Sequence, residues 1–372
     1  MKKLVVLAVL LATAVPASAT TSRILPLQDA WPVWSPTGGR IAFTRISANS
    51  MALEILRLGA HSSVTQVARN AGQLSPSWSS DGTRLVYSAG GRIYVVTADG
   101  GSRHQLPFPR PSYAPAFQPG GTAIAYLTSH GARNLDLWVD GSLRARNAIG
   151  QPAWASDGKR IAFQRDDGIY VSSADGSVTK VASASNPGPP VFSGDEVFYT
   201  AQSRIWRVDV ATTDAATPIS PAFADIGTPS LATDRDGLAF TWRRGLEVES
   251  AGRFTLVAPA GLGAAWSPPV KGESSLAYAG PRATCPGQMV LRLRRDSGSN
   301  AGLTGSCIVS GTPRADVIEG SPREGDVILG LAGNDQVHAN DGHTDRVNCG
   351  PGRDTVWADR TDKLVGCEIV HR

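Results

Sequence analysis

The sequence predicts an all-β protein: a seven-bladed β-propeller over residues 20–310, followed by a small parallel β-roll over residues 311–372. Three observations support this prediction. A segment with an aromatic anchor recurs about every 40 residues, and a shorter repeat built on aspartate recurs about every nine residues near the C-terminus. The 40 glycines and 25 prolines among 372 residues indicate many turns. With 41% hydrophobic and 18% charged residues, the composition excludes a disordered chain.

The propeller prediction depends first on a column of anchor residues. Each anchor lies in a stretch such as SWSSDGT (77–83) or AWASDGK (153–159). The seven anchors are separated by 44, 39, 37, 38, 39 and 35 residues: Trp34, Trp78, Phe117, Trp154, Phe192, Leu231 and Trp266. A period near 40 residues is typical of propeller blades. Two β-sandwiches in tandem, the alternative all-β arrangement, would not require a constant period.

Two further columns supply the other strands of each repeat. A Phe or Tyr stands nine residues after five of the seven anchors, at the end of segments such as RIAF and RLVY. A third column alternates apolar and polar residues and stops at Asp-Gly turns, as in RIYVVTADG (92–100) and GIYVSSADG (168–176). Because a short fourth segment closes most repeats, we expect four strands per blade, with each anchor packed as a wedge between neighbouring blades.

The motif W-S-P/S-D-G, followed by I-A-F, I-Y-V and D-G, resembles the repeat of TolB-like propellers, a WD-type repeat family of exported bacterial proteins. The resemblance covers about residues 24–300. Proteins of the TolB type carry an α/β domain before the propeller, whereas only residues 20–30 stand before the first blade here. The resemblance therefore implies the fold and export, and the difference argues against a role in a Tol–Pal envelope system.

The first residues predict export. Two lysines precede an apolar run over residues 4–15, and the small residues Ala-Ser-Ala follow at 17–19. This pattern is typical of a secretory signal peptide over residues 1–19, cleaved before Thr20. The alternative is a buried N-terminal strand. The apolar run is too short to span a bilayer, so we predict no transmembrane segment and a secreted, periplasmic or cell-surface location.

Export makes disulfide bonds possible, and all four cysteines lie near the C-terminus. Their order favours the pairs Cys285–Cys307 and Cys349–Cys367, although four cysteines allow three connectivities. Each bridge would close a loop of about 20 residues and stabilise the protein by roughly 3 kcal/mol.

The second repeat begins near residue 311. Its six aspartates are spaced 10, 9, 10, 9 and 8 residues apart, with an apolar residue two positions after each: Asp316, Asp326, Asp335, Asp345, Asp354 and Asp362. A nine-residue period of this type predicts a parallel β-roll, with the apolar residue inside and the carboxylate facing an ion. Since two repeats make one coil, Asp316 should stack with Asp335, Asp335 with Asp354, and Asp326 with Asp345.

This segment resembles the hemolysin-type, or RTX, calcium-binding repeats. Two turns match well, GLAGNDQV (330–337) and CGPGRDTV (349–356), and their fourth positions are Gly333 and Gly352. The resemblance implies Ca²⁺ as the bound ion. We predict these metal-binding residues: Asp316, Asp326, Gly333, Asp335, Asp345, Gly352 and Asp354. Because Arg314, Glu324 and His343 replace glycine in other turns, the alternative is a decayed roll whose aspartates only cap turns.

No catalytic pattern is visible. The sequence contains neither G-x-S-x-G nor H-E-x-x-H, and His61, His104 and His130 occupy different positions in their repeats. Its arginines are scattered, so we expect no nucleic-acid partner. We therefore expect a monomeric, non-catalytic scaffold that binds a protein, peptide or glycan in the envelope or extracellular space. One alternative is a carbohydrate-active enzyme, either a polysaccharide lyase or a glycosidase. Another is a roll that serves as a surface-attachment or secretion module.

Overall fold

The computed structural model describes residues 20–21, 23–24, 28–47, 50–58, 63–71, 76–129, 135–212, 215–222, 230–231, 237–242, 245–250, 253–258, 262–268, 275–281, 289–295, 300–302, 308–311, 313–320 and 325–372. These residues form strands and turns, with no helix among them, and so none that could cross a membrane. The chain divides into two compact units, Leu25–Gly305 and a second one that combines Met1–Ile24 with Ser306–Arg372. The predicted signal peptide lies outside the described residues.

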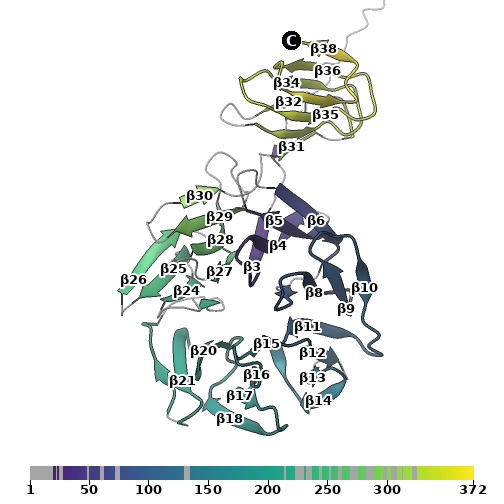
Figure 1. Cartoon of the computed structure of the whole chain (residues 1–372). Coiled ribbons are helices and arrows are strands. Elements are labelled where there is room, and N and C mark those ends of the chain that lie inside the picture. The colour runs from purple at the N-terminus through teal and green to yellow at the C-terminus, as the bar shows by residue number, and fades with distance from the viewer. Residues whose placement is uncertain are drawn as a thin grey trace, which may run out of the picture. The chain divides into compact units, whose positions relative to one another are not determined.

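The unit Leu25–Gly305 is a seven-bladed propeller, so the predicted fold class is confirmed. Figure 1 shows its four-stranded antiparallel sheets arranged around a centre. Blade 1 contains β3 (Gln28–Trp34), β4 (Arg40–Ser47), β5 (Ser50–Arg57) and β6 (Ser63–Arg69). Blade 2 contains β7 (Ser77–Trp78), β8 (Arg84–Ala89), β9 (Arg92–Thr97) and β10 (Arg103–Gln105). Blade 3 contains β11 (Ser112–Phe117), β12 (Ile124–Ser129), β13 (Leu135–Val139) and β14 (Ser142–Ala145).

The remaining four blades repeat this order. Blade 4 contains β15 (Ile149–Trp154), β16 (Ile161–Arg165), β17 (Gly168–Ser172) and β18 (Val178–Ser183). Blade 5 contains β19 (Val191–Ser193), β20 (Glu196–Ala201), β21 (Arg204–Asp209) and β22 (Thr217–Pro218). Blade 6 contains β23 (Ser230–Leu231), β24 (Gly237–Trp242), β25 (Gly245–Ser250) and β26 (Arg253–Ala258). Blade 7 contains β27 (Leu262–Trp266), β28 (Ser275–Pro281), β29 (Met289–Arg295) and β30 (Asn300–Gly302).

Three tryptophan anchors cross the seams between blades. Each of them ends the first strand of its blade and donates its indole N–H to a backbone carbonyl in the first strand of the preceding blade. Trp78 Nε1 donates to Val33 O at 3.0 Å, and Trp154 Nε1 donates to Ala116 O at 3.2 Å. Each acceptor residue immediately precedes the anchor of its own blade. The anchors therefore combine apolar packing with a directed bond between neighbouring sheets.

The ring closes between blades 7 and 1 by the same contact. Trp34 Nε1 donates to Ala265 O at 3.1 Å. The fully buried carboxylate of Asp29 accepts the backbone N–H of Leu291 at 3.1 Å, and Arg45 Nε donates to it at 2.8 Å. All four strands of blade 7 come from one continuous stretch of chain. They share an eight-stranded sheet with blade 1, in which β29 pairs with β3 at a single position.

A proline column that the sequence analysis did not use accompanies a bulge in the first strand of several blades. In six repeats proline stands two residues before the anchor: Pro32, Pro76, Pro115, Pro152, Pro190 and Pro229. The pairing of β3 and of β11 with the next strand shifts just before the anchor, where Trp31 (φ 48°) and Ala114 (φ 50°) adopt left-handed backbone conformations. Proline has no N–H to donate, so it fits where the ladder of hydrogen bonds is interrupted.

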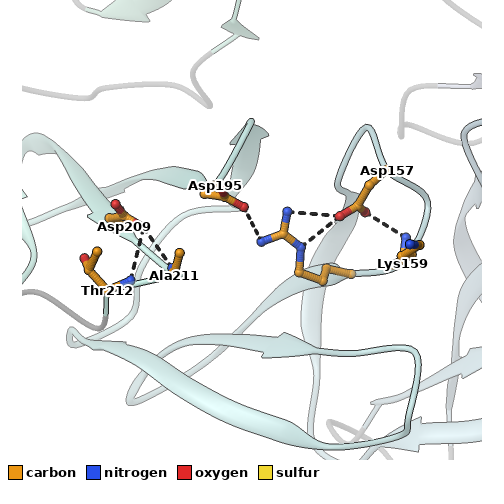
Figure 2. Close-up of polar contacts among 7 residues, drawn as sticks. Asp157, Lys159, Asp195, Asp209, Ala211 and Thr212 are labelled. Atoms are coloured by element: carbon orange, nitrogen blue, oxygen red, sulfur yellow. Dashed lines mark hydrogen bonds and ion pairs between the residues drawn. The ribbon is translucent and has the colours of Figure 1, made fainter.

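Turns at the anchor end of the blades also bond to one another. Gln118 Nε2 donates to Gly158 O at 2.7 Å, which links the turns of blades 3 and 4. Arg160 Nη1 lies 2.7 Å from Asp195 Oδ1, and Arg160 Nε donates to Asp157 Oδ2 at 3.1 Å, which links blades 4 and 5. Figure 2 shows the guanidinium between Asp157 and Asp195. These polar links hold the turns in place on the side of the ring where the anchors end.

The roll is built from two parallel sheets. One contains β1 (Thr20–Thr21), β32 (Asp316–Glu319), β34 (Gln336–Ala339), β36 (Thr355–Ala358) and β38 (Ile369–His371). The other contains β2 (Arg23–Ile24), β31 (Ile308–Ser310), β33 (Val327–Leu329), β35 (Arg346–Asn348) and β37 (Lys363–Val365), and only its β2–β31 pair is antiparallel. Their buried core includes the apolar residues two positions after five of the aspartates: Ile318, Ile328, Val337, Val347 and Val356.

The structure divides the chain differently from the predicted boundaries at 20 and 310. Strand β1 pairs with β32 and strand β2 with β31, so residues 20–24 belong to the roll although the sequence placed them with the propeller. Two-residue strands carry no periodic pattern, and this pairing therefore had no signal in the sequence.

Removing a tryptophan anchor tests the importance of these seams. Trp78 is 6% exposed, so Trp78→Ala should lower the free energy of unfolding by about 3–5 kcal/mol in urea melts. Trp78→Phe keeps the ring but loses the N–H, and should cost roughly 1–2 kcal/mol. Leu143→Ala, at an exposed position of β14, serves as the control and should change stability by less than about 0.5 kcal/mol. A loss below about 1 kcal/mol for Trp78→Ala would show that the anchors do not hold the blades together.

Candidate metal centre: the aspartate ladder of the roll

Six aspartates lie at the starts of the roll strands, and all are buried. Their exposed fractions are 3% for Asp316, 1% for Asp326, 1% for Asp335, 0% for Asp345, 0% for Asp354 and 7% for Asp362. Buried carboxylates are rare unless they are paired, hydrogen-bonded or bound to a metal. The partners of their oxygens therefore decide what this array can do.

One oxygen of four of these carboxylates accepts a backbone N–H from the coil before it. The backbone N–H of Asp316 donates to Asp335 Oδ1 at 2.9 Å, and that of Asp335 donates to Asp354 Oδ1 at 2.8 Å. On the other edge the N–H of Asp326 donates to Asp345 Oδ1 at 2.6 Å, and that of Asp345 donates to Asp362 Oδ1 at 2.8 Å. The aspartates thus form two ladders, each with a spacing of one coil, which is the stacking that a two-repeat coil requires.

The second oxygen of three carboxylates is buried without a hydrogen-bond partner. These atoms are Asp335 Oδ2, Asp345 Oδ2 and Asp354 Oδ2. A Cβ atom added at Gly330 would lie 2.7 Å from Asp335 Oδ2, so the glycine leaves room for this oxygen. An ionised carboxylate oxygen that is buried and unpaired is strongly unfavourable. The ladder therefore needs a cation or a proton to neutralise it.

The pKa values of two aspartates reflect this requirement. Burial raises the pKa of Asp335 to about 6, and the carboxylates of Asp354 and Asp316 add to the increase. Burial likewise raises the pKa of Asp345 to about 7, with further contributions from Asp341, Asp362 and Asp326. In both cases the hydrogen bond that the carboxylate accepts from a backbone N–H lowers the pKa and so opposes this increase.

The structure adds a carboxylate that the sequence analysis missed. Asp326, Asp341 and Asp345 each offer one oxygen, and these oxygens lie within 4.8 Å of one another. Asp341 occupies the turn before β35, at a position where nine-residue calcium-binding repeats carry glycine, and His343 Nδ1 lies 3.3 Å from its Oδ1. The sequence analysis could have found Asp341 from this substitution, because an acidic side chain stands there at a position where the repeat has glycine. Three convergent carboxylates suit a hard divalent cation, which prefers oxygen ligands.

Gly333 and Gly352 lie in stacked turns. A Cβ atom at Gly352 would lie 1.6 Å from Gly333 O, and the N–H of Gly333 donates to Pro351 O at 3.1 Å. These positions require glycine because the backbones of consecutive coils approach closely. Nearby, Cys349 and Cys367 form a disulfide bond. Cys285 and Cys307 lie outside the described residues.

Comparison with known proteins supports the fold only. No family model and no curated protein matches the sequence. Among solved structures, the β-propeller domain of the Trilobed protease from Pyrococcus furiosus matches 76% of this chain and 99% of its own, with 13% identity and a TM-score of 0.54. The acylaminoacyl peptidase of Pyrococcus horikoshii matches 75% of this chain at 13% identity and a TM-score of 0.54. The chain spans about half the length of that peptidase, 52%.

A TolB structure is also among the matches. TolB from Acinetobacter baumannii matches 72% of this chain and 80% of its own, with 14% identity and a TM-score of 0.44. The strand topology of the chain itself defines the class: a seven-bladed propeller joined to a parallel β-roll. At these identities the similarity does not extend to activity.

The raised pKa values predict how the stability of the metal-free roll depends on pH. Between about pH 4 and pH 7 the folded roll holds more protons than the unfolded chain, whose aspartates titrate near 3.9, so stability should fall as pH rises through this window. Hydrogen exchange of the roll amides in chelator, corrected for intrinsic exchange rates, measures this directly.

Asp345→Asn should flatten the pH dependence, because it removes the carboxylate whose pKa is raised most. Asp175→Asn is the control, since Asp175 lies exposed in a propeller turn and its hydrogen bonds lower its pKa. Protection that increases from pH 4 to pH 7 would contradict the prediction.

Proposed function

We propose that the protein is an exported, monomeric and non-catalytic binding scaffold. Its propeller presents a surface to a protein, peptide or glycan outside the cytoplasm, and its roll is a calcium-binding module. The observation that carries the calcium part is the set of buried carboxylate oxygens without partners. The TolB-like repeat and the signal-peptide pattern in the sequence support export.

The donor set of the roll fits calcium. Asp326, Asp341 and Asp345 would hold an ion on one edge, and Asp316, Asp335 and Asp354 would do so on the other, with turn carbonyls completing the coordination. Ca²⁺ accepts six to eight oxygens in flexible geometry, whereas Mg²⁺ demands a tighter octahedron and keeps its waters. A bound cation would neutralise carboxylates that otherwise repel one another. Calcium would therefore stabilise the roll most strongly at neutral pH.

Calcium binding can be tested on the full mature chain. Millimolar Ca²⁺ should release heat in calorimetry and increase the protection of roll amides against hydrogen exchange, and Mg²⁺ should do so less. Asp345→Asn should weaken calcium binding by about tenfold, whereas Asp175→Asn should leave it unchanged. If neither heat nor added protection is observed, the roll is a solenoid stabilised by its disulfide and by the aspartate caps.

The propeller supports binding through its rigid ring. Interblade bonds join neighbouring sheets, and the turns at the anchor end are linked to one another, so this face is held in fixed geometry. Of the three histidines in the propeller repeats, His104 is exposed on β10, and His61 and His130 lie outside the described residues. The competing function is an enzyme, and two of the similar propellers belong to a peptidase and a protease. The enzyme class that the sequence analysis named is a carbohydrate-active one.

A screen with a turnover assay separates these functions. The mature chain should bind members of a peptide or glycan array, and the bound compounds should be recovered unchanged after prolonged incubation. Chromatography of each recovered ligand measures this. Cleavage or elimination of a bound glycan would instead establish a carbohydrate-active enzyme.

A further inference from the structure

A pocket of about 250 Å³ lies at the seam between blades 3 and 4. The hairpin that joins β13 to β14 forms one wall, and the end of β17 forms another. The turn after β15 brings Lys159 to the rim, and the anchor Trp154 lines the pocket with the part of its side chain that remains partly exposed. This volume is at the small end for ligand sites and suits a group of about one sugar ring.

Hydrogen-bonding side chains dominate the lining. They include Gln118, Asp140 and Ser172, two further serines and two cationic residues. The apolar contribution consists of Trp154 and a few small or branched side chains. A pocket with one aromatic surface and many hydroxyl, amide and charged groups suits a polyhydroxylated ring better than an apolar peptide side chain.

Ser172 supplies an independent sign of a ligand. Its side chain is 2% exposed, it lines the pocket, and its Oγ has no hydrogen-bond partner. A buried hydroxyl without a partner costs stability, because its hydrogen bonds to water are lost and not replaced. A polar group of a bound molecule would restore that bond.

The charges of the pocket favour an anion. Arg144 is positioned at the rim, where its Nη1 donates to Ala174 O at 3.3 Å, and no carboxylate pairs with Lys159 Nζ among the described residues. The neighbouring Asp157 accepts the backbone N–H of Lys159 at 2.8 Å (Figure 2) and pairs with the guanidinium of Arg160 at 3.0 Å. Against these two cations, Asp140 is the single acidic residue in the lining.

We propose that this pocket binds a uronic acid residue, that is, a sugar ring bearing a carboxylate, as part of an acidic polysaccharide. The indole of Trp154 packs against the ring, Arg144 and Lys159 take the carboxylate, and Ser172 and Asp140 bond to ring hydroxyls. The proposal rests on the binding function proposed for the propeller and names the ligand class and its place.

The test uses calorimetry or saturation-transfer NMR on the full mature chain. D-glucuronate and D-galacturonate are compared with neutral D-glucose and with inorganic phosphate at matched ionic strength. At least one uronate should bind about tenfold more tightly than glucose and more tightly than phosphate, since only a uronate offers both the ring and the carboxylate. Arg144→Gln should weaken uronate binding by about tenfold, and Arg110→Gln, an exposed arginine elsewhere in the propeller, should not.

Ser172→Ala gives a readout that a purely structural role would not produce. The substitution removes a buried hydroxyl that has no partner, so the melting temperature should stay the same or rise while uronate affinity falls about fivefold. Uronates that bind no better than glucose or phosphate, or affinities unchanged in both pocket variants, would overturn the proposal. If array ligands still bind in those same variants, only this pocket is excluded and the scaffold function stands. If no array ligand binds the wild-type chain, the scaffold function itself fails.

Discussion

The propeller depends on side chains that bond across the seams to the backbone of the neighbouring blade, as the indoles do at three of them. Sheets packed face to face could slide past one another, because apolar contact alone is not directional. The indole N–H of Trp34, Trp78 and Trp154 fixes the position by bonding to the carbonyl beside the previous anchor. At the seam between blades 7 and 1, the same bond closes the ring together with the hydrogen bond from the backbone N–H of Leu291 to the buried carboxylate of Asp29. The pocket between blades 3 and 4 lies beside one of these anchors, so the geometry of the seam also sets the geometry of the candidate binding site.

In the roll, too, side chains bond to the backbone of the neighbouring repeat, and here they are carboxylates in place of indoles. Four of the aspartates, Asp335, Asp345, Asp354 and Asp362, cap the backbone N–H of the aspartate one coil earlier. This role explains why aspartate recurs on both edges even where the surrounding glycines are lost. Asp362 shows this clearly, because its turn lacks the glycines of the repeat and it still accepts the N–H of both Asp345 and Asp359. In Asp335, Asp345 and Asp354, capping uses one oxygen, and the other oxygen is buried without a hydrogen-bond partner. The structural role of the ladder thereby creates the need for a neutralising ion or proton.

Sequence reasoning predicted most of the fold because both repeats are periodic. Anchors such as Trp78 and the inward residues of the roll recur at nearly regular spacing, because the same buried position must be filled in every repeat. The features it missed have no period. Strands β1 and β2 are too short to show alternation, and Asp341 joins the carboxylate cluster through the fold of a single turn. Ser172 looks like any other serine in a strand, and only the packing of two blades shows that its hydroxyl is buried beside a pocket. Periodicity thus predicts architecture, whereas individual sites arise where one repeat departs from the others.

The pairing of residues 20–24 with the roll has a consequence for the whole chain. The segment that enters the propeller and the segment that leaves it both belong to the same small unit, so the propeller is an insertion within the roll. Folding of the roll ties the two ends of the propeller chain together, and the loop-closure entropy of joining blade 7 to blade 1 is then already lost. Because the roll already holds the two ends of the propeller together, the ring has less need of a strand exchanged between its first and last blades to close it. Any ligand that binds only the folded roll stabilises this connection between the propeller's ends. The stability of the propeller is then linked to a site in a different unit.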